Sequence, residues 1–161
     1  MRRILLLPAY EHVYRDIIYF NEEKTFMFFK LYDKELLFSV NIRVQAGINL
    51  EKGFSLDNDG THSIRITLPE PEILLIDADE TTIKELFITE WGKEINRLDY
   101  YSEIENKKEA VAADAVKRGI LVKAAQNIDF MLTNLFKSAG YDSVTIIFEG
   151  QDNEEEKTPV D

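Results

Sequence analysis

The clearest pattern in the chain is an alternation over residues 36–47 that makes one set of positions apolar and the other set largely polar. The apolar positions are Leu36, Phe38, Val40, Ile42, Val44 and Ala46. A period of two places successive side chains on opposite faces of a β-strand. The segment therefore predicts one strand of an antiparallel sheet, with one face packed and one face wet. Gly47 is expected to end it.

Further strands are predicted on both sides of this segment. Residues 9–20 are rich in aromatic and β-branched side chains, which favours a strand. Residues 24–35 lead into the central strand through a turn expected at Asp33–Lys34. Residues 54–68 predict a hairpin, because Asp59–Gly60 lies between two short strand-like runs and supplies the positive φ that such turns need.

The stretch "ITLPEPEILLIDADE" (66–80) could be either a structural corner between two strands or a functional site built from its acidic residues. Pro69 and Pro71 cannot donate ladder hydrogen bonds, so strand pairing should stop there and the chain should turn. Residues 73–76 then begin a new apolar segment. On this interpretation the acids that follow, Asp77, Asp79 and Glu80, form a solvated loop. Residues 81–92 fit either a strand or a helix, and a strand is preferred.

The last large element is predicted to be a long helix. Ser102 and Glu105 have the spacing of a capping box, and no proline occurs from residue 103 to residue 139. Apolar residues recur at helical spacing from Leu121 to Ala139. Gly119 is expected to bend the helix into segments 103–118 and 120–139. A final strand is predicted over 142–150.

These elements predict one α+β domain over residues 1–150. A mainly antiparallel sheet would be covered by the long, bent C-terminal helix, and the final strand would return to the sheet. Residues 151–161 are acidic and poor in apolar side chains, which predicts a disordered tail.

Charge and composition narrow the classes of function. The net charge is −11, and the chain has no cysteine. Nucleic-acid binding needs Lys and Arg to replace phosphate counterions, so an acidic chain without a basic run is a poor candidate. Anionic membrane surfaces are disfavoured for the same reason. The apolar run in "MRRILLLPAY" is too short to span a membrane, so we expect a soluble chain.

Several segments, taken in order, resemble a bacterial family of unknown function, DUF4230, over about residues 9–149. They are "YEHVYRDIIYF" (10–20), "VQAGINLEK" (44–52), "DGTHSIRITLPEPEIL" (59–74) and "AVKRGILVKAAQNIDFMLTNLFKSAGYDSVTIIF" (115–148). The resemblance implies a sheet with a long late helix and supplies no catalytic residues. It also implies relatives with an N-terminal membrane anchor, and therefore an extracytoplasmic, membrane-tethered domain.

Candidate chemistry is sparse. The run "DNDG" (57–60) resembles the start of a calcium loop, but its glycine comes too early, and a hairpin turn is preferred. His12 and His62 lack a partner at metal-ligand spacing. Trp91 is expected to pack in the core or against a loop, with a partly exposed anchor for a partner as the alternative. We therefore assign no catalytic, cofactor-binding or metal-binding residue.

Two functions follow from this, and a third depends on a cavity. The leading hypothesis is a non-catalytic binding or assembly module with a protein partner or a second copy. The alternative is a carboxylate- or metal-dependent hydrolase that uses the acids of residues 70–80, namely Glu70, Glu72, Asp77, Asp79 and Glu80. A carrier of a small apolar ligand would need an internal cavity between helix and sheet.

Overall fold

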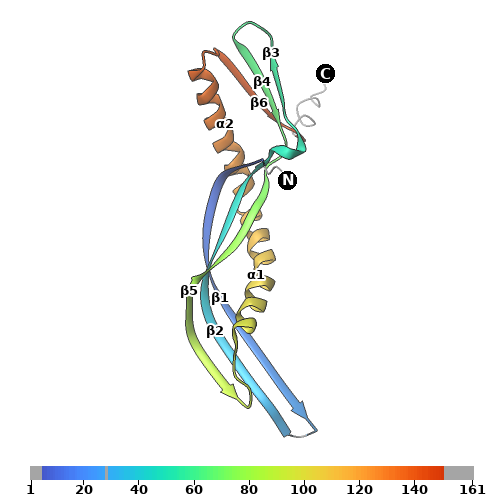
Figure 1. Ribbon diagram of the computed structural model, residues 1–161, viewed down its shortest axis with the longest axis vertical. Helices are drawn as coiled ribbons and strands as arrows, with labels where there is room; N and C mark the ends of the chain where they lie inside the picture. Colours follow the sequence, from blue (N-terminus) through green and yellow to red (C-terminus); the bar gives the residue numbers. More distant parts are fainter. Residues whose placement is uncertain (1–4, 28, 151–161) are drawn as a thin grey trace, which may run out of the picture. The chain divides into compact units, whose positions relative to one another are not determined.

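The structure is a computed structural model that describes residues 5–27 and 29–150 (Figure 1). The predicted tail, 151–161, lies outside the described residues. The chain divides into two compact units. We call residues 12–44 and 75–118 the α1 unit, and residues 5–11, 45–74 and 119–150 the α2 unit. The single domain expected from the sequence stays a prediction.

Three long strands form the first sheet. They are β1 (Leu6–Phe26), β2 (Phe29–Asn49) and β5 (Glu72–Trp91), in the order β1-β2-β5, and neighbouring strands run antiparallel (Figure 1). The expected turn at Asp33–Lys34 and the expected end at Gly47 are both wrong, because β2 continues through these positions. The turn follows β1 instead, where Met27 has φ 56°.

The core of the α1 unit confirms the alternation that the sequence shows. The apolar positions of residues 36–44 are fully buried, and helix α1 (Arg97–Lys117) contributes Ile104, Val111 and Ala115 to the buried set. Phe38 and Tyr100 pack with their ring centroids 5.0 Å apart. Lys34 lies two residues before Leu36 in the same alternation, and it is also fully buried.

The α2 unit holds a second, smaller sheet, which corrects the expectation of one sheet. It consists of β3 (Ser55–Asn58), β4 (Ser63–Leu68) and β6 (Ser143–Phe148), in the order β3-β4-β6. The predicted hairpin is the antiparallel pair β3–β4, whereas β6 pairs with β4 in parallel. Helix α2 (Ile120–Ser138) packs against this sheet. The shared core residues are Ile48, Ile64, Ile66, Leu68, Ile128 and Phe148.

Residues 69–71 form the predicted corner. Pro69 and Pro71 separate β4 from β5, and those two strands belong to different sheets. The strand preference for residues 81–92 is confirmed up to Trp91. The acidic loop expected at Asp77, Asp79 and Glu80 is wrong, because these residues lie within β5. The apolar run at 73–76 therefore continues as one strand through the acids.

Two helices replace the single long bent helix. Gly119 has φ 81°, a left-handed conformation that ends regular α-helix there, so the interruption falls where it was predicted. The predicted start is wrong. Helix α1 begins after Asn96, whose side chain accepts from Leu98 N, while Asp99 accepts from Asn96 N in a reciprocal capping box. Ser102 and Glu105 lie inside α1.

Among the described residues, neither α1 nor α2 is long and apolar enough to cross a membrane.

Candidate functional site

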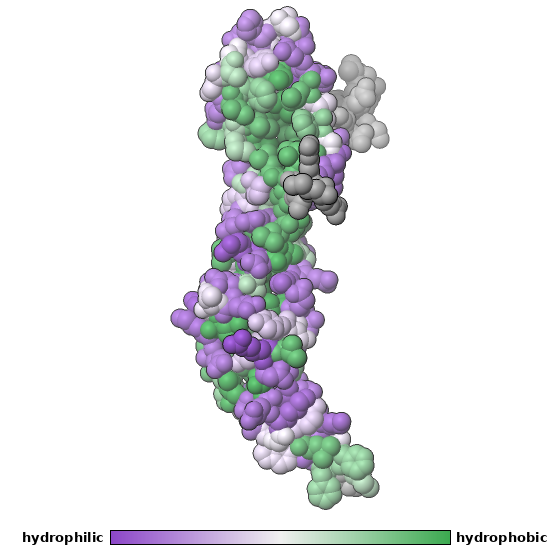
Figure 2. Space-filling model, viewed as in Figure 1, coloured by the Kyte–Doolittle hydropathy of each residue, from purple (hydrophilic) through white to green (hydrophobic). Residues whose placement is uncertain are grey.

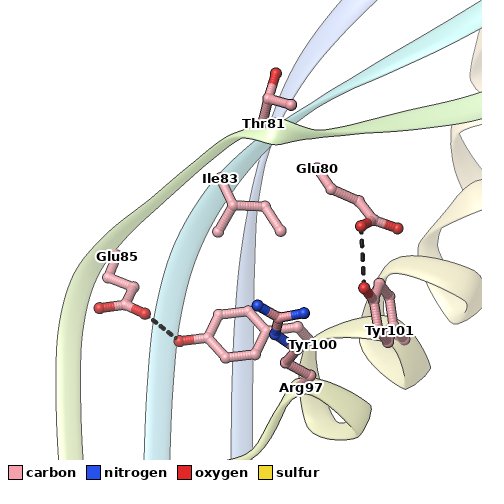
Figure 3. A pocket seen from close by; sticks show the side chains of 7 residues that line it. All are labelled: Glu80, Thr81, Ile83, Glu85, Arg97, Tyr100 and Tyr101. Atoms are coloured by element: carbon pink, nitrogen blue, oxygen red, sulfur yellow. Dashed lines mark hydrogen bonds between the residues drawn. The ribbon is translucent and has the colours of Figure 1, made fainter.

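A cavity of about 360 Å³ lies in the α1 unit, between β5 and the first turns of α1 (Figure 3). Its lining consists of Glu80, Thr81, Ile83, Glu85, Arg97, Tyr100 and Tyr101. The reciprocal cap at Asn96 and Asp99 fixes where α1 starts. It therefore fixes which α1 side chains face β5.

Two phenol–carboxylate pairs cross this cavity. Tyr100 Oη donates to Glu85 Oε1 at 2.6 Å, and Tyr101 Oη donates to Glu80 Oε2 at 3.0 Å (Figure 3). Burial, followed by the Glu85 hydrogen bond, raises the pKa of Tyr100. The hydrogen bond to Glu80 raises the pKa of Tyr101. Both phenols therefore stay protonated at neutral pH and act as hydrogen-bond donors.

Arg97 is the one cation of the lining, and it makes no ion pair with another described residue. Its guanidinium remains available for an acceptor, while each lining carboxylate already accepts from a tyrosine. This arrangement is suited to holding a small polar group. It does not pair a nucleophile with a base that could activate it.

A second polar cluster surrounds Lys34, also in the α1 unit. The Lys34 ammonium is fully buried, and its Nζ lies 2.8 Å from Glu22 Oε2 and 2.9 Å from Asp99 Oδ2. Burial alone would lower the pKa of Lys34. The hydrogen bonds to the two carboxylates outweigh burial, so the pKa is raised and the lysine stays charged.

Glu22 collects further donors in this cluster. Tyr32 Oη donates to its Oε1 at 2.8 Å, and Lys93 Nζ lies 3.7 Å from the same oxygen. The hydrogen bond from Lys34, then that from Tyr32, lowers the pKa of Glu22 to about 2. The cluster thus ties β1 and β2 to the N-terminus of α1 through charged hydrogen bonds. The same first turn of α1 carries Arg97 and Tyr100 of the cavity lining.

The structure does not bring the five acids of residues 70–80 together. Glu70 and Glu72 belong to the α2 unit, where Glu72 pairs with Lys52. Asp77, Asp79 and Glu80 belong to the α1 unit. There Asp79 Oδ1 accepts from the backbone N and hydroxyl of Thr81 at 3.1 and 2.5 Å. Glu80 alone of the five lines the cavity.

The other candidates also lie apart. Asp59 Oδ1 accepts from Thr61 N and Oγ1 at 2.9 and 2.7 Å, which confirms a turn at "DNDG". His12 belongs to the α1 unit, where it packs against Tyr14, and His62 belongs to the α2 unit. In the described part of the chain, no three or more His, Asp or Glu side chains are placed to hold a metal ion. The expected burial of Trp91 is wrong, since it is exposed.

Sequence reasoning missed both the cavity tyrosines as a site and the Lys34 cluster. The predicted helix began at residue 103, so Tyr100 and Tyr101 were placed before the helix and not on its first turns. The signal for Lys34 was available, because it continues the inward alternation of Leu36 and Phe38 by one more step. A lysine at such a position predicts a buried cation that needs carboxylate partners.

Comparison with known proteins identifies the family to which the sequence belongs. No curated protein and no solved structure matches the chain. A family profile described as "Protein of unknown function (DUF4230)" matches residues 1–146, which is most of the 161 residues. The chain therefore belongs to the DUF4230 family.

Proposed function

We propose that this chain is a non-catalytic binding and assembly module that pairs with a second copy of itself along β1. The observation that carries the proposal is the free edge of this strand. In the order β1-β2-β5, β1 (21 residues) pairs with a strand on one side only, and near its start Ala9 O accepts from Asn127 Nδ2 of α2 at 2.9 Å. An edge strand offers unpaired backbone N–H and C=O groups to another strand.

The side chains of β1 favour contact with protein at this edge. Val13, Ile17 and Tyr19 are 50%, 58% and 58% exposed, and they share one face of the strand because their spacing is even. On the opposite face, Ile18 is buried. Natural edge strands are commonly protected by inward charges, prolines or bulges. From Val13 to Tyr19 the strand has no proline. It carries Arg15 between the exposed apolar side chains, and Asp16 on the α1 face, where Asp16 Oδ2 lies 3.6 Å from Lys107 Nζ.

The other edge of this sheet, β5, is less suited to pairing. At Asn41 the backbone N–H donates to the Thr82 hydroxyl at 2.9 Å. Thr82 Oγ1 in turn donates to Asp79 O at 2.6 Å, and β5 bends here (Figure 3). A local break of this kind disfavours a flat edge-to-edge contact.

A second copy is the partner that this geometry favours. Two β1 edges related by a two-fold axis run antiparallel and satisfy each other's backbone groups. The pairing uses up the free β1 edge of both chains, so the assembly closes as a dimer. The net charge of −11 on each copy opposes association, and added salt should therefore strengthen the dimer.

The hydrolase alternative gains no support from the arrangement of the acids. It required the acids of residues 70–80 to converge. They lie in two different units, and Glu72, Asp79 and Glu80 each have a separate local partner. The cavity at Tyr100 and Arg97 supports binding of a small polar group, which is compatible with a non-catalytic module.

Sedimentation velocity over a concentration series tests the proposal. We expect a dimer that dissociates on dilution and that Ile17→Lys disrupts, because a charge on the exposed face of the edge opposes pairing. Val122→Lys on α2 is the matched control, since Val122 is also apolar and 60% exposed. A wild-type chain that stays monomeric at every concentration, in low and high salt, would overturn the proposal.

A further inference from the structure

The turn between β1 and β2 ends in a tip of exposed apolar side chains. Phe26, Met27 and Phe29 are 65%, 78% and 75% exposed, and we call these three residues the hairpin tip. Leu31 is also exposed. Figure 2 shows apolar side chains gathered at this end of the hairpin. Large side chains of this kind at the end of a hairpin lose contact with water only when another phase or molecule covers them.

The hairpin tip is apolar on both faces of the sheet. Even-numbered residues of β1 and β2 point toward α1, as Ile18 and Leu36 do. By this alternation Phe26 lies on the α1 face and Phe29 on the opposite face. A flat protein surface would cover one face and leave the other wet. A medium that surrounds the tip, such as the acyl region of a bilayer, covers both.

The residues behind the tip have the composition of a membrane interface. Lys24 and Lys30 flank the run "FMFF" (26–29) in the sequence. Lys93 Nζ lies 4.9 Å from the centre of the Tyr32 ring, and Trp91 is exposed at the end of β5. Tyr, Trp and Lys are the side chains enriched where hydrocarbon meets head groups.

The local charge permits this contact despite the acidic chain. Residues 22–34 contain three lysines and three acids, whereas the whole chain carries −11. Lys30 Nζ pairs with Asp33 Oδ2 at 2.6 Å and with Glu23 Oε2 at 3.5 Å. Residues 22–34, which we call the collar, are therefore neutral in total charge. Zwitterionic head groups match such a collar. The expectation from the net charge, that anionic membrane surfaces are disfavoured, does not apply to apolar insertion.

We propose that the hairpin tip inserts into the interfacial layer of a lipid bilayer, with Phe26, Met27 and Phe29 below the head groups. The Tyr32, Trp91, Lys30 and Lys93 side chains then lie at head-group level. A tip of three side chains gives weak, reversible binding. The inference goes beyond the proposed function, since tip insertion does not require pairing through β1.

Vesicle binding by the full chain tests the inference, with Trp91 as a built-in reporter because it is the single tryptophan. The probes are vesicles of pure phosphatidylcholine and vesicles with added phosphatidylserine, at low and high salt. We expect the wild type to float with phosphatidylcholine vesicles in both salt conditions. Trp91 emission should shift to the blue, and brominated acyl chains should quench it.

Matched variants locate the contact. Phe29→Glu should reduce the partition coefficient by at least about ten-fold, because it places a charge at the apolar tip. Met27→Asp should do the same without backbone strain, since Met27 has φ 56° and aspartate tolerates this region. Phe130→Glu on α2 is the control, because Phe130 is 72% exposed, and it should leave partitioning within about two-fold.

Four results would overturn the inference. The first is that the chain binds no vesicle, and the second is that it binds only anionic vesicles and that salt abolishes this binding. The third is that the tip variants bind vesicles as well as the wild type does. The fourth is that the tip variants change self-association and leave lipid binding unchanged. The β1 variant Ile17→Lys separates the two proposals. If it abolishes the dimer and monomers still bind vesicles, the inference stands by itself. If the tip variants bind vesicles as well as the wild type does, the inference fails, and the proposal of dimer formation through β1 is unaffected.

Discussion

Lys34 Nζ donates to Asp99 Oδ2 at 2.9 Å, and this hydrogen bond connects β2 to the first turn of α1. The same carboxylate oxygen accepts from Asn96 N at 2.9 Å as half of the helix cap. One side chain thus begins the helix and neutralises a buried cation. The register of α1 on the sheet, and with it the position of Tyr100 and Tyr101, depends on Asp99.

Asp99→Asn should destabilise the chain by about 2 kcal/mol, because the buried Lys34 ammonium loses one of its two carboxylates while the shape is kept. Urea unfolding at neutral pH measures this change. Asp129→Asn on the exposed surface of α2 is the control and should cost less than about 0.5 kcal/mol. Equal effects of the two substitutions would contradict the role given to Asp99.

Glu22 makes stability depend on pH in the acid range. Its pKa is lowered from 4.5 to about 2, so the folded state favours the ionised carboxylate. The resulting stabilisation is fully present above pH 4.5 and is lost as the pH falls toward 2. We expect the wild type to lose more stability than Glu22→Gln between these pH values. Thermal melts of both proteins at several pH values in this window measure the two losses of stability. Equal losses in the wild type and in Glu22→Gln would contradict the prediction.

Gly47 tolerates no side chain. A Cβ at this position would lie 2.1 Å from Leu7 O and 2.8 Å from Pro8 Cα, both of which are backbone atoms. Gly47→Ala should therefore destabilise the chain by at least about 2 kcal/mol. Gly60→Asn should be nearly neutral, since nothing lies near its Cβ and asparagine adopts the positive φ. Denaturant unfolding of the two variants compares them directly, and a neutral Gly47→Ala would show that β1 does not approach Gly47.

The two units should unfold together, as the prediction of one domain requires. Residues of β1, β2 and β5 contribute to both units. Ile128→Ala removes a fully buried side chain of the α2 unit and should cost about 2–5 kcal/mol. We expect amide protection to fall by the same free energy in both units. Loss of protection confined to the α2 unit would show that residues 1–150 form two domains.

Local chemistry made several elements predictable. The alternation at 36–46 predicted the buried face of β2, Pro69 and Pro71 predicted the change of sheet, and Gly119 predicted the end of the first helix. Each of these depends on backbone geometry or on a period within one segment. The split into two sheets was not predictable in this way, because β6 pairs in parallel with β4 across many intervening residues.

Elements that depend on a partner elsewhere in the chain were misjudged. Lys34 and Asp99 are 65 residues apart, and neither predicts the other by spacing. The cap at 96–99 is an N-x-x-D version of the capping box that was sought as S-x-x-E. Trp91 was expected inside on the basis of its apolar area. It ends β5 in an exposed position, which composition alone could not reveal.

The most direct test of the account is amide hydrogen exchange of residues 12–19 at two protein concentrations. If two copies pair along β1, exchange in this segment should slow as the dimer forms, because edge N–H groups gain partners. Residues 143–148 of β6 should exchange at the same rate in both samples. Exchange in residues 12–19 that does not change between a dilute and a concentrated sample would contradict assembly through β1.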